Sequence, residues 1–474
     1  MAVVPNVLAQ RYASREMAAL WSPEHKVVLE RRLWIAVMRA QAELGVEVPG
    51  AAIEASEAVV EEVDLASIEA RERVTRHDVK ARIEEFAALA GHEHAHKGMT
   101  SRDVTENVEQ VQVRDGLRLV RSRVVTALAR LADRAAEHEG TALTGRSHNV
   151  AAQVTTLGKR FANAGEELLQ ALHRIDDLLA RYPLRGLKGP VGTSQDQLDL
   201  LGGDAGALDR MEAAVAAELG FEARLASVGQ VYPRSLDLDV VAALLQAAAG
   251  PSSLCTTLRL MAGAELASEG FAPGQVGSSA MPHKMNARSC ERVTGLTQVL
   301  RGHLAMIAGL AGDQWNEGDV SDSQVRRVAL PDAFYTVDGI FQTFLTVLEG
   351  FTAYPAVISA ELCRELPFLT TTRVLMAAVQ AGVGREVAHD VIKEHAVAAA
   401  LARRQGVAGG GDLTTRLAQD DRLPLDADRL AALVGDPLAV VGDAPRQVRA
   451  FVARVAAIVA TDPEAAAYAP EPIL

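Results

Sequence analysis

The chain has 474 residues, which is more than one ordinary hydrophobic core supports, so we expect two or three domains. Hydrophobic residues make up 49% of the sequence and aromatic residues only 4%, a balance that favours helices packed on helices. The formal net charge of −13 argues against nucleic acid and anionic membrane as partners, because both repel an acidic protein.

The cysteines and the first residues indicate the cellular compartment. Cys255, Cys290 and Cys363 are odd in number and widely spaced, which is typical of a reducing environment. The N-terminal segment lacks a basic stretch followed by an apolar core. No uncharged apolar run approaches the roughly 18 residues that span a bilayer. We therefore expect a soluble protein of the cytoplasm.

In chain order, the first segment whose side chains suit binding or catalysis is Thr75-Arg-His-Asp-Val-Lys80. Neighbouring side chains on a helix point in different directions. At a helix start, however, Arg76 and His77 can both reach an anion beside free backbone N–H groups. A charged and solvated helix terminus explains the same residues equally well.

The tract 91–98 contains three histidines and matches the H-E-x-x-H pattern of zinc peptidases at His92, Glu93 and His96. That pattern binds zinc only on a helix, and here two glycines bracket less than two turns. No third ligand is evident, so we expect no metal. A solvated loop, or a pocket with one catalytic histidine beside the polar turn 98–103, explains the tract better.

A continuous apolar stripe at helical spacing follows this tract. Its members are Val113, Leu117, Val120, Val124, Leu128, Leu131 and Ala135. Further helical patterns cover residues 156–179, 236–269, 291–310 and 330–348. A stripe this long requires a long partner helix to bury it, and several long helices indicate a bundle.

These patterns predict an all-α fold of three helical domains. We expect an N-terminal domain over residues 1–108, a central long-helix bundle over 109–360 and a smaller C-terminal helical domain over 361–474. The glycine run at 409–411 breaks the last part into shorter helices.

The segment Arg146-Ser-His-Asn149 lies between two of the predicted helices. A lone histidine in a loop is more often structural than catalytic. However, only histidine titrates near neutral pH without perturbation, so His148 is a candidate acid for protonating a nitrogen leaving group.

The most informative segment is Gly277-Ser-Ser-Ala-Met-Pro-His-Lys-Met-Asn286. It brings a serine pair, a cation and an amide donor into one Gly-flanked loop. Removal of a proton next to a carboxylate creates a dianion, which needs this kind of cationic and hydrogen-bonding stabilisation. A generic polar linker has no need for the combination.

This loop resembles the GSSxMPxKxN hallmark of the fumarase/aspartase superfamily. Within that superfamily, segments spread over about residues 11 to 335 are similar to the adenylosuccinate lyase family. They are RYAS from Arg11, TRHDVKARIEEF from Thr75, HKGMTSRD from His96, RGLKGPVGT from Arg185, GQVYPRSLDLDV from Gly229 and SDSQVRRVALPDA from Ser321.

The resemblance implies a homotetramer of three-domain helical subunits, with each active site built from several subunits. It implies β-elimination of fumarate from adenylosuccinate, giving AMP, and from succinylaminoimidazole carboxamide ribotide in purine biosynthesis. The implied partner is therefore a small-molecule purine nucleotide substrate. No metal or organic cofactor takes part.

By position, the resemblance makes Ser278 the base that removes the succinyl β-proton, while Ser279 stays open as an alternative. It makes His148 the acid, and it assigns Lys284 and Asn286 to stabilising the aci-carboxylate. The remaining implied residues support the acid and hold the substrate. They are Glu291, His96, Arg11, Tyr12, Arg76, His77, Asp78, Thr100, Ser101, Gln230, Arg292, Ser323 and Arg327.

The sequence departs from the family at two positions. Ala287 replaces a proline that usually follows the Lys-x-Asn element, and Gly318 replaces an arginine of a W-x-E-R segment. With the second change, one anion contact is either missing or supplied by another residue, so position 318 is assigned no function. Two alternatives therefore stay open beside the family's reaction. The chain is another lyase of the superfamily, such as argininosuccinate lyase, or it is a catalytically silent helical scaffold.

Overall fold

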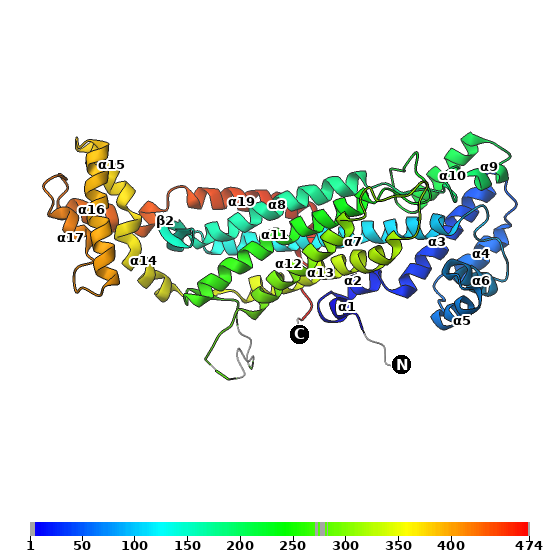
Figure 1. Ribbon diagram of the computed structural model, residues 1–474, viewed down its shortest axis with the longest axis horizontal. Coiled ribbons are helices and arrows are strands. Elements are labelled where there is room, and N and C mark those ends of the chain that lie inside the picture. Colours follow the sequence, from blue (N-terminus) through cyan, green and yellow to red (C-terminus); the bar gives the residue numbers. More distant parts are fainter. Residues whose placement is uncertain (1–4, 271–273, 275–279, 282, 473–474) are drawn as a thin grey trace.

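Five long helices lie side by side and form the body of the molecule (Figure 1). They are α7 (Ser101–Glu137), α8 (Leu157–Arg181), α11 (Ser235–Gly263), α12 (Arg288–Ala308) and α13 (Asp322–Gly350). The structure is a computed structural model, and it describes residues 5–270, 274, 280–281 and 283–472. Within these residues most of the chain is helical and the strands are few and short, which confirms the predicted all-α class.

Other helices cover the two ends of the bundle (Figure 1). At the right-hand end of the figure lie α3 (Pro23–Glu43), α4 (Gly50–Ala58), α5 (Leu65–Thr75), α6 (Asp78–Ala90), α9 (Gln195–Leu200) and α10 (Ala205–Glu218). At the left-hand end lie α14 (Pro355–Leu369), α15 (Thr371–Gln380), α16 (Arg385–Arg404) and α17 (Leu413–Ala418). The other helices are α1 (Val7–Arg11), α2 (Arg15–Leu20), α18 (Ala427–Val434), a 3₁₀ turn (Pro437–Val440), α19 (Ala444–Thr461) and α20 (Pro463–Ala466).

The apolar stripe predicted from the sequence lies on α7, and every one of its side chains is buried. It packs against α8, α13 and α19. Full burial of a large aliphatic side chain contributes about 1.5–3 kcal/mol, so the stripe is a main source of the bundle's stability.

Side chains cap the bundle helices at defined residues. The Asp103 carboxylate accepts a hydrogen bond of 2.8 Å from the N–H of Thr100 at the start of α7. At the start of α8, the Thr156 hydroxyl accepts one of 3.2 Å from the N–H of Lys159. These contacts satisfy polar backbone groups that have no partner inside the helix.

Two predicted helix boundaries were wrong. α11 ends at Gly263 and not at 269, because the chain turns at Glu265, whose φ is +57°, and continues into the short strand β3 (Ala267–Ser268). β3 pairs with β4 (Thr352–Ala353). α13 begins eight residues before the predicted 330 and runs through Pro331. Its first turns carry buried charged residues, so apolar spacing becomes visible only later.

A hairpin was missed altogether. β1 (Ala142–Ser147) pairs antiparallel with β2 (Val150–Thr156), with a bulge between Gly145 and Arg146. His148 and Asn149 form its two-residue turn, and both have positive φ angles of 53° and 61°. Two positive φ angles in succession are typical of the tight turns that join antiparallel strands.

A network of buried charges ties α7 to the starts of α11 and α13. Glu106 accepts hydrogen bonds from both terminal nitrogens of Arg234, at 2.8 and 3.0 Å. Arg326 donates to Asp237 at 2.8 Å and to Glu109 at 2.7 Å. Burial alone would raise the pKa of Glu106, but the two arginines hold it below its ordinary value.

We expect Glu106→Ala to lower the free energy of unfolding by about 3–5 kcal/mol, because it leaves buried arginines with fewer partners. Urea denaturation of the variant and the wild type measures the difference. The matched control is Glu61→Ala, since Glu61 pairs with Arg32 at the exposed surface. Its loss should stay below about 1 kcal/mol. Equal losses in the two variants would contradict a stabilising role for the network.

By length and composition, α11 is the one helix of the described residues that could cross a membrane. The sequence expectation overlooked residues 240–258, which carry no charge. However, 56% of the most apolar window of α11 is buried inside the structure, and α8, α12 and α13 cover it. Its packing is that of a core helix.

The division into three sequence domains stays a prediction. α19 belongs to the predicted C-terminal part, yet it lies along α7 and α8. Val448, Phe451 and Val455 of α19 are buried in the same apolar core as the bundle helices.

Candidate active site

The first group of predicted residues meets where α6, α7 and α13 begin. It comprises His77, Asp78, Ser101, Ser323 and Arg327. His77 Nε2 lies 3.4 Å from Ser101 Oγ, and a terminal nitrogen of Arg327 lies 3.7 Å from an Asp78 carboxylate oxygen. Three helices that are far apart in the sequence therefore converge here.

His77 is the N-cap of α6, as its position at a helix start predicted. Its Nδ1 accepts a hydrogen bond of 3.3 Å from the N–H of Lys80. In the neutral ring, Nε2 then carries the proton and faces Ser101. Arg76 ends α5 in a left-handed conformation, so two short helices meet at this pair of residues.

Asp78 holds arginines beside this group. Arg82 donates to it at 3.2 Å. Burial would raise the pKa of Asp78, but Arg82 and the N–H of Val79 hold it below its ordinary value. A carboxylate that stays charged in this way orients Arg82 and Arg327.

His96 is half-buried near the first group. Its Nδ1 accepts a hydrogen bond of 3.1 Å from the indole N–H of Trp34. Burial lowers the pKa of His96 to about 4. The ring is therefore neutral at pH 7 and keeps its proton on Nε2, where it can donate to a substrate but not add a positive charge.

We expect the wild type to lose more stability between pH 7 and pH 5 than His96→Gln does. Unfolded histidine binds a proton near pH 6.5, whereas folded His96 binds one only near pH 4. The unfolded state therefore gains the proton first as the pH falls, and the folded state loses its advantage. Urea unfolding at both pH values measures this loss. An identical loss in both proteins would refute the burial of a neutral His96.

The second group consists of Arg11, Tyr12 and Arg292. The Arg292 guanidinium carbon lies 5.5 Å from the centre of the Tyr12 ring, which is within cation–π range. Tyr12 packs closely on α13 at Gly339, where an added Cβ would come within 2.8 Å of the Tyr12 Cβ. This contact fixes an aromatic face beside Arg292, an arrangement that suits a base or an anion.

The third group lies at the base of the hallmark loop. Lys284, Asn286 and Glu291 line a cavity of about 1060 Å³ together with Arg259 and Tyr354. A terminal nitrogen of Arg259 lies 3.7 Å from Glu291 Oε1. Ser278 and Ser279 lie outside the described residues, so the assignment of the base stays a prediction.

His148 lies at the exposed tip of the β1–β2 hairpin. Arg146 donates to the Asn149 carbonyl at 3.3 Å across the turn, and this contact braces the turn that presents His148. Arg146 also pairs with Glu361 of α14.

One copy of the chain does not bring His148 to the first group within the described residues. α7 has 37 residues and is therefore about 55 Å long. Thr100 and Ser101 lie at its start, and the hairpin follows its end. Figure 1 shows β2 and α6 at opposite ends of the bundle.

Gly318, where the family's arginine is missing, lies in a tight contact with the segment that carries Gln230. The N–H of Gln230 donates to the Glu317 carbonyl at 2.6 Å. Gly318 has a φ of 135°, and an added Cβ would lie 3.2 Å from the Gln230 Cβ. Any side chain at 318 is therefore strained and crowded in this backbone.

Sequence reasoning missed Arg102, which connects α7 to the first group. Its side chain is only 12% exposed. It donates to Ser323 Oγ at 3.1 Å and to Glu106 at 3.0 Å. The signal was present as an Arg–Glu pair at i, i+4 directly after Ser101.

Asp103 was also missed. One carboxylate oxygen accepts from Arg185 at 2.7 Å and from the N–H groups of Lys188 and Gly189 at 2.9 and 3.0 Å. Asp103 therefore shapes the Gly-rich loop under the start of α7. No sequence spacing predicts a contact between residues so far apart in the chain.

Residues 92–98 form a turn and not a helix. His92 contacts Ser56, with its Nε2 3.0 Å from Ser56 Oγ. Among the described residues, no group of three or more histidine, cysteine or carboxylate side chains is placed to hold a metal ion. The arrangement that zinc peptidases require is therefore missing from this tract.

Two family models match the chain. The model described as "Lyase" matches residues 10–302, and the one described as "Adenylosuccinate lyase C-terminus" matches residues 367–451. The adenylosuccinate lyase of Saccharomyces cerevisiae is 36% identical over 454 residues, which cover 94% of this chain and 93% of the relative. That of Schistosoma mansoni is 33% identical over 456 residues, 94% of each chain.

Solved structures share the fold. The 3-carboxy-cis,cis-muconate lactonizing enzyme from Pseudomonas putida aligns with a TM-score of 0.83 at 21% identity, covering 96% of this chain and 100% of that one. The fumarate lyase from Mesorhizobium sp. BNC1 aligns with a TM-score of 0.80 at 21% identity, covering 94% and 99%. At such identities the likeness is evidence of the fold alone.

Proposed function

This chain belongs to the adenylosuccinate lyase family of the fumarase superfamily and is a carbon–nitrogen lyase, and from that premise we propose its substrates and residue roles. It eliminates fumarate from adenylosuccinate, giving AMP, and from succinylaminoimidazole carboxamide ribotide. The observation that carries the proposal is the near full-length similarity to adenylosuccinate lyases.

The chemistry is a β-elimination that needs one base and one acid. Ser278 removes the β-proton of the succinyl group, and the electron pair left behind forms the double bond of fumarate. The carbon–nitrogen bond breaks, and His148 gives a proton to the departing nitrogen. Lys284 and Asn286 stabilise the aci-carboxylate that develops before the bond breaks.

The first and second groups suit a phosphorylated nucleotide. Arg327 and the Nε2–H of His77 are donors for phosphate oxygens, and Ser323 adds a hydroxyl. Tyr12 offers a face for the base or ribose, flanked by Arg11. In support of these roles, all five residues lie at the surface of the bundle or only partly buried.

The separation of His148 from the first group supports a site shared between copies of the chain. Residues about 55 Å apart can act on one small substrate only if different subunits supply them. We therefore include a homotetramer in the proposal, in which the hairpin of one subunit lies at the α6–α7 end of another.

One face of α12 is suited to such assembly. Gly295 and Gly302 stand seven residues apart, and an added Cβ at either would meet nothing within 4 Å. Val299 and Met306 of the same helix are 40% and 39% exposed. A heptad-spaced face of small and apolar residues allows close packing against a second helix, and the described part of the chain leaves it uncovered. The free cysteines fit the proposed cytoplasmic location.

Two serine variants test the assignment of the base. We expect Ser278→Ala to lower kcat by about 10²–10⁴-fold, the usual contribution of a positioned base. Ser279→Ala is the matched control and should lose much less. Steady-state kinetics with adenylosuccinate measures both. The reverse order would move the role to Ser279, and normal turnover in both variants would contradict a serine base.

A further inference from the structure

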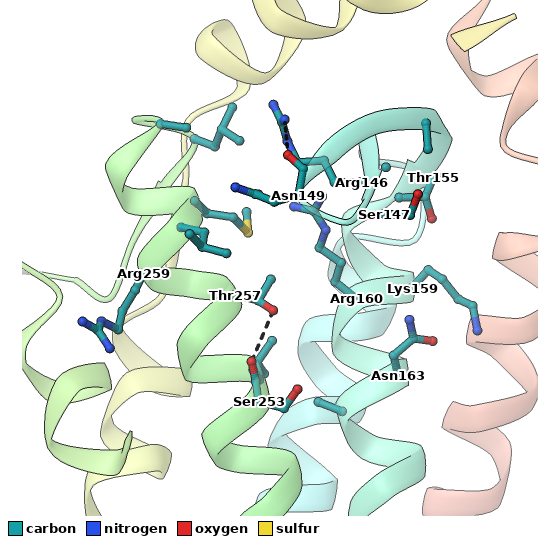
Figure 2. A pocket seen from close by; sticks show the side chains of 18 of the residues that line it. Arg146, Ser147, Asn149, Thr155, Lys159, Arg160, Asn163, Ser253, Thr257 and Arg259 are labelled. Carbon is teal, nitrogen blue, oxygen red and sulfur yellow. Dashed lines mark hydrogen bonds between the residues drawn. The ribbon is translucent and has the colours of Figure 1, made fainter. Parts of the chain in front are cut away.

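A large cavity opens between the β1–β2 hairpin, α8 and α11, with a volume of about 1230 Å³ (Figure 2). None of the described residues that line it belongs to the predicted active site. Its polar lining residues include Arg146, Lys159, Arg160, Ser253 and Thr257. The residues that line this cavity are therefore a different set from the predicted site residues.

Positive charge outweighs negative charge in this cavity. Four basic residues line it, Arg146, Lys159, Arg160 and Arg259, whereas Glu167 is the only acidic residue among the described lining residues. This excess is local, because the whole chain carries a net charge of −13. A basic cavity in an acidic protein favours an anionic ligand.

Arg160 is the central cation. In Figure 2 its side chain extends from α8 toward Arg146 and Asn149 of the hairpin. It donates to the Thr144 carbonyl at 2.9 Å. The nearest carboxylate, Glu361, already forms an ion pair with Arg146. Two guanidinium groups therefore share one carboxylate, which compensates only one of their two positive charges.

Arg160 and Lys159 occupy positions that do not favour the folded state. Burial and the neighbouring Arg146 lower the pKa of Arg160, which shows that its charge is poorly compensated. Lys159 and Arg160 also lie in the first turns of α8, which contain no acidic residue. Cations are disfavoured there because the helix dipole is positive at that end.

Hydroxyl groups stand opposite the arginines. Thr257 of α11 lines the cavity one turn after Ser253, and its hydroxyl donates to the Ser253 carbonyl at 3.2 Å. The Ser253 side chain is exposed to the cavity side of α11 (Figure 2). Guanidinium donors on one wall and the Ser253 hydroxyl on the other are suited to a ligand with several oxygen atoms.

We propose that this cavity binds a small dianion, a phosphate or a dicarboxylate, between Arg160 with Arg146 on one side and Ser253 on the other. None of the predicted site residues that the structure describes lines this cavity, although Arg259 also lines the cavity of the third group, and binding there requires nothing of the proposed reaction. The cavity lies next to the hairpin turn that contains His148.

Calorimetric titration of the full-length protein with inorganic phosphate, and separately with succinate, tests the proposal. Arg327→Gln is introduced first, so that anions bound at the first group do not contribute. In that background we expect Arg160→Gln to weaken binding about tenfold or more, since a charge-assisted hydrogen bond is lost. The matched control is Lys159→Gln, because Lys159 lines the same cavity but points away from Arg160 in Figure 2.

A second variant distinguishes a loss of binding from a loss of folding. Ser253→Asp leaves both arginines in place and puts a negative charge at the opposite wall, so it should also weaken binding, with an unchanged melting temperature. Tighter binding of phosphate assigns the tetrahedral ion, and tighter binding of succinate assigns the dicarboxylate. Failure of both anions to bind, or an affinity in Arg160→Gln and Ser253→Asp equal to that of the Arg327→Gln parent, would overturn the proposal.

Discussion

Replacing His148 with alanine is expected to lower kcat for adenylosuccinate by about 10²–10⁴-fold, because the leaving nitrogen then departs without a proton. KM should change little, since the phosphate and base are held by other groups. His148 sits at a hairpin tip with its turn braced by Arg146, so the substitution removes a side chain without disturbing the core. Steady-state kinetics gives both constants.

The matched control for this variant is His173→Ala. His173 is an exposed histidine on α8, away from the hairpin turn. It should keep turnover close to that of the wild type. Near-normal turnover in His148→Ala would remove His148 from the role of the acid.

Mixing two inactive variants is expected to restore activity. In His148→Ala and His77→Ala the substitutions lie at opposite ends of the bundle (Figure 1). If each site takes these two residues from different subunits, random reassembly leaves about a quarter of the sites intact. Unfolding, mixing and refolding the two proteins together, followed by an assay at low substrate concentration, measures the recovery.

A second mixture provides the control. His77→Ala and Arg327→Ala both alter the first group, where Asp78 links the two elements. One subunit supplies both residues, so every site in that mixture is damaged and activity should stay low. Recovery in the control mixture, or none in the His148→Ala mixture, would contradict the shared site.

The long helices could be predicted from the sequence because their signal is local. The stripe from Val113 to Ala135 repeats at helical spacing within one element, and burial of every member follows from that spacing. The N-cap role of His77 was predictable for the same reason, since it depends on residues three positions away.

The hairpin and the buried charges could not be predicted in this way. The turn His148-Asn149 lacks the glycine that usually marks a tight hairpin, and its strands are too short for a clear alternation. The contacts of Glu106 with Arg234 and Arg326 join residues more than a hundred positions apart. Charged residues are usually solvated, so their burial is decided by tertiary packing and not by local pattern.

The residues of the candidate site were predicted from the sequence, but their separation into distant groups was not. The hallmark loop and the Thr75–Lys80 segment were recognised by resemblance, which carries no information on distance. Only the length of α7 shows that one chain holds the first group and the hairpin of His148 about 55 Å apart. The role of Arg102 as a link to Ser323 likewise appeared only in the folded chain.

The proposed reaction is the elimination of fumarate from adenylosuccinate without a metal. Ultraviolet absorbance of the purified protein with adenylosuccinate, in the presence of a chelator, follows this reaction. We expect conversion to AMP and fumarate at a rate that the chelator does not change. No conversion by a folded, assembled protein would contradict it, and argininosuccinate would then be the next substrate to test.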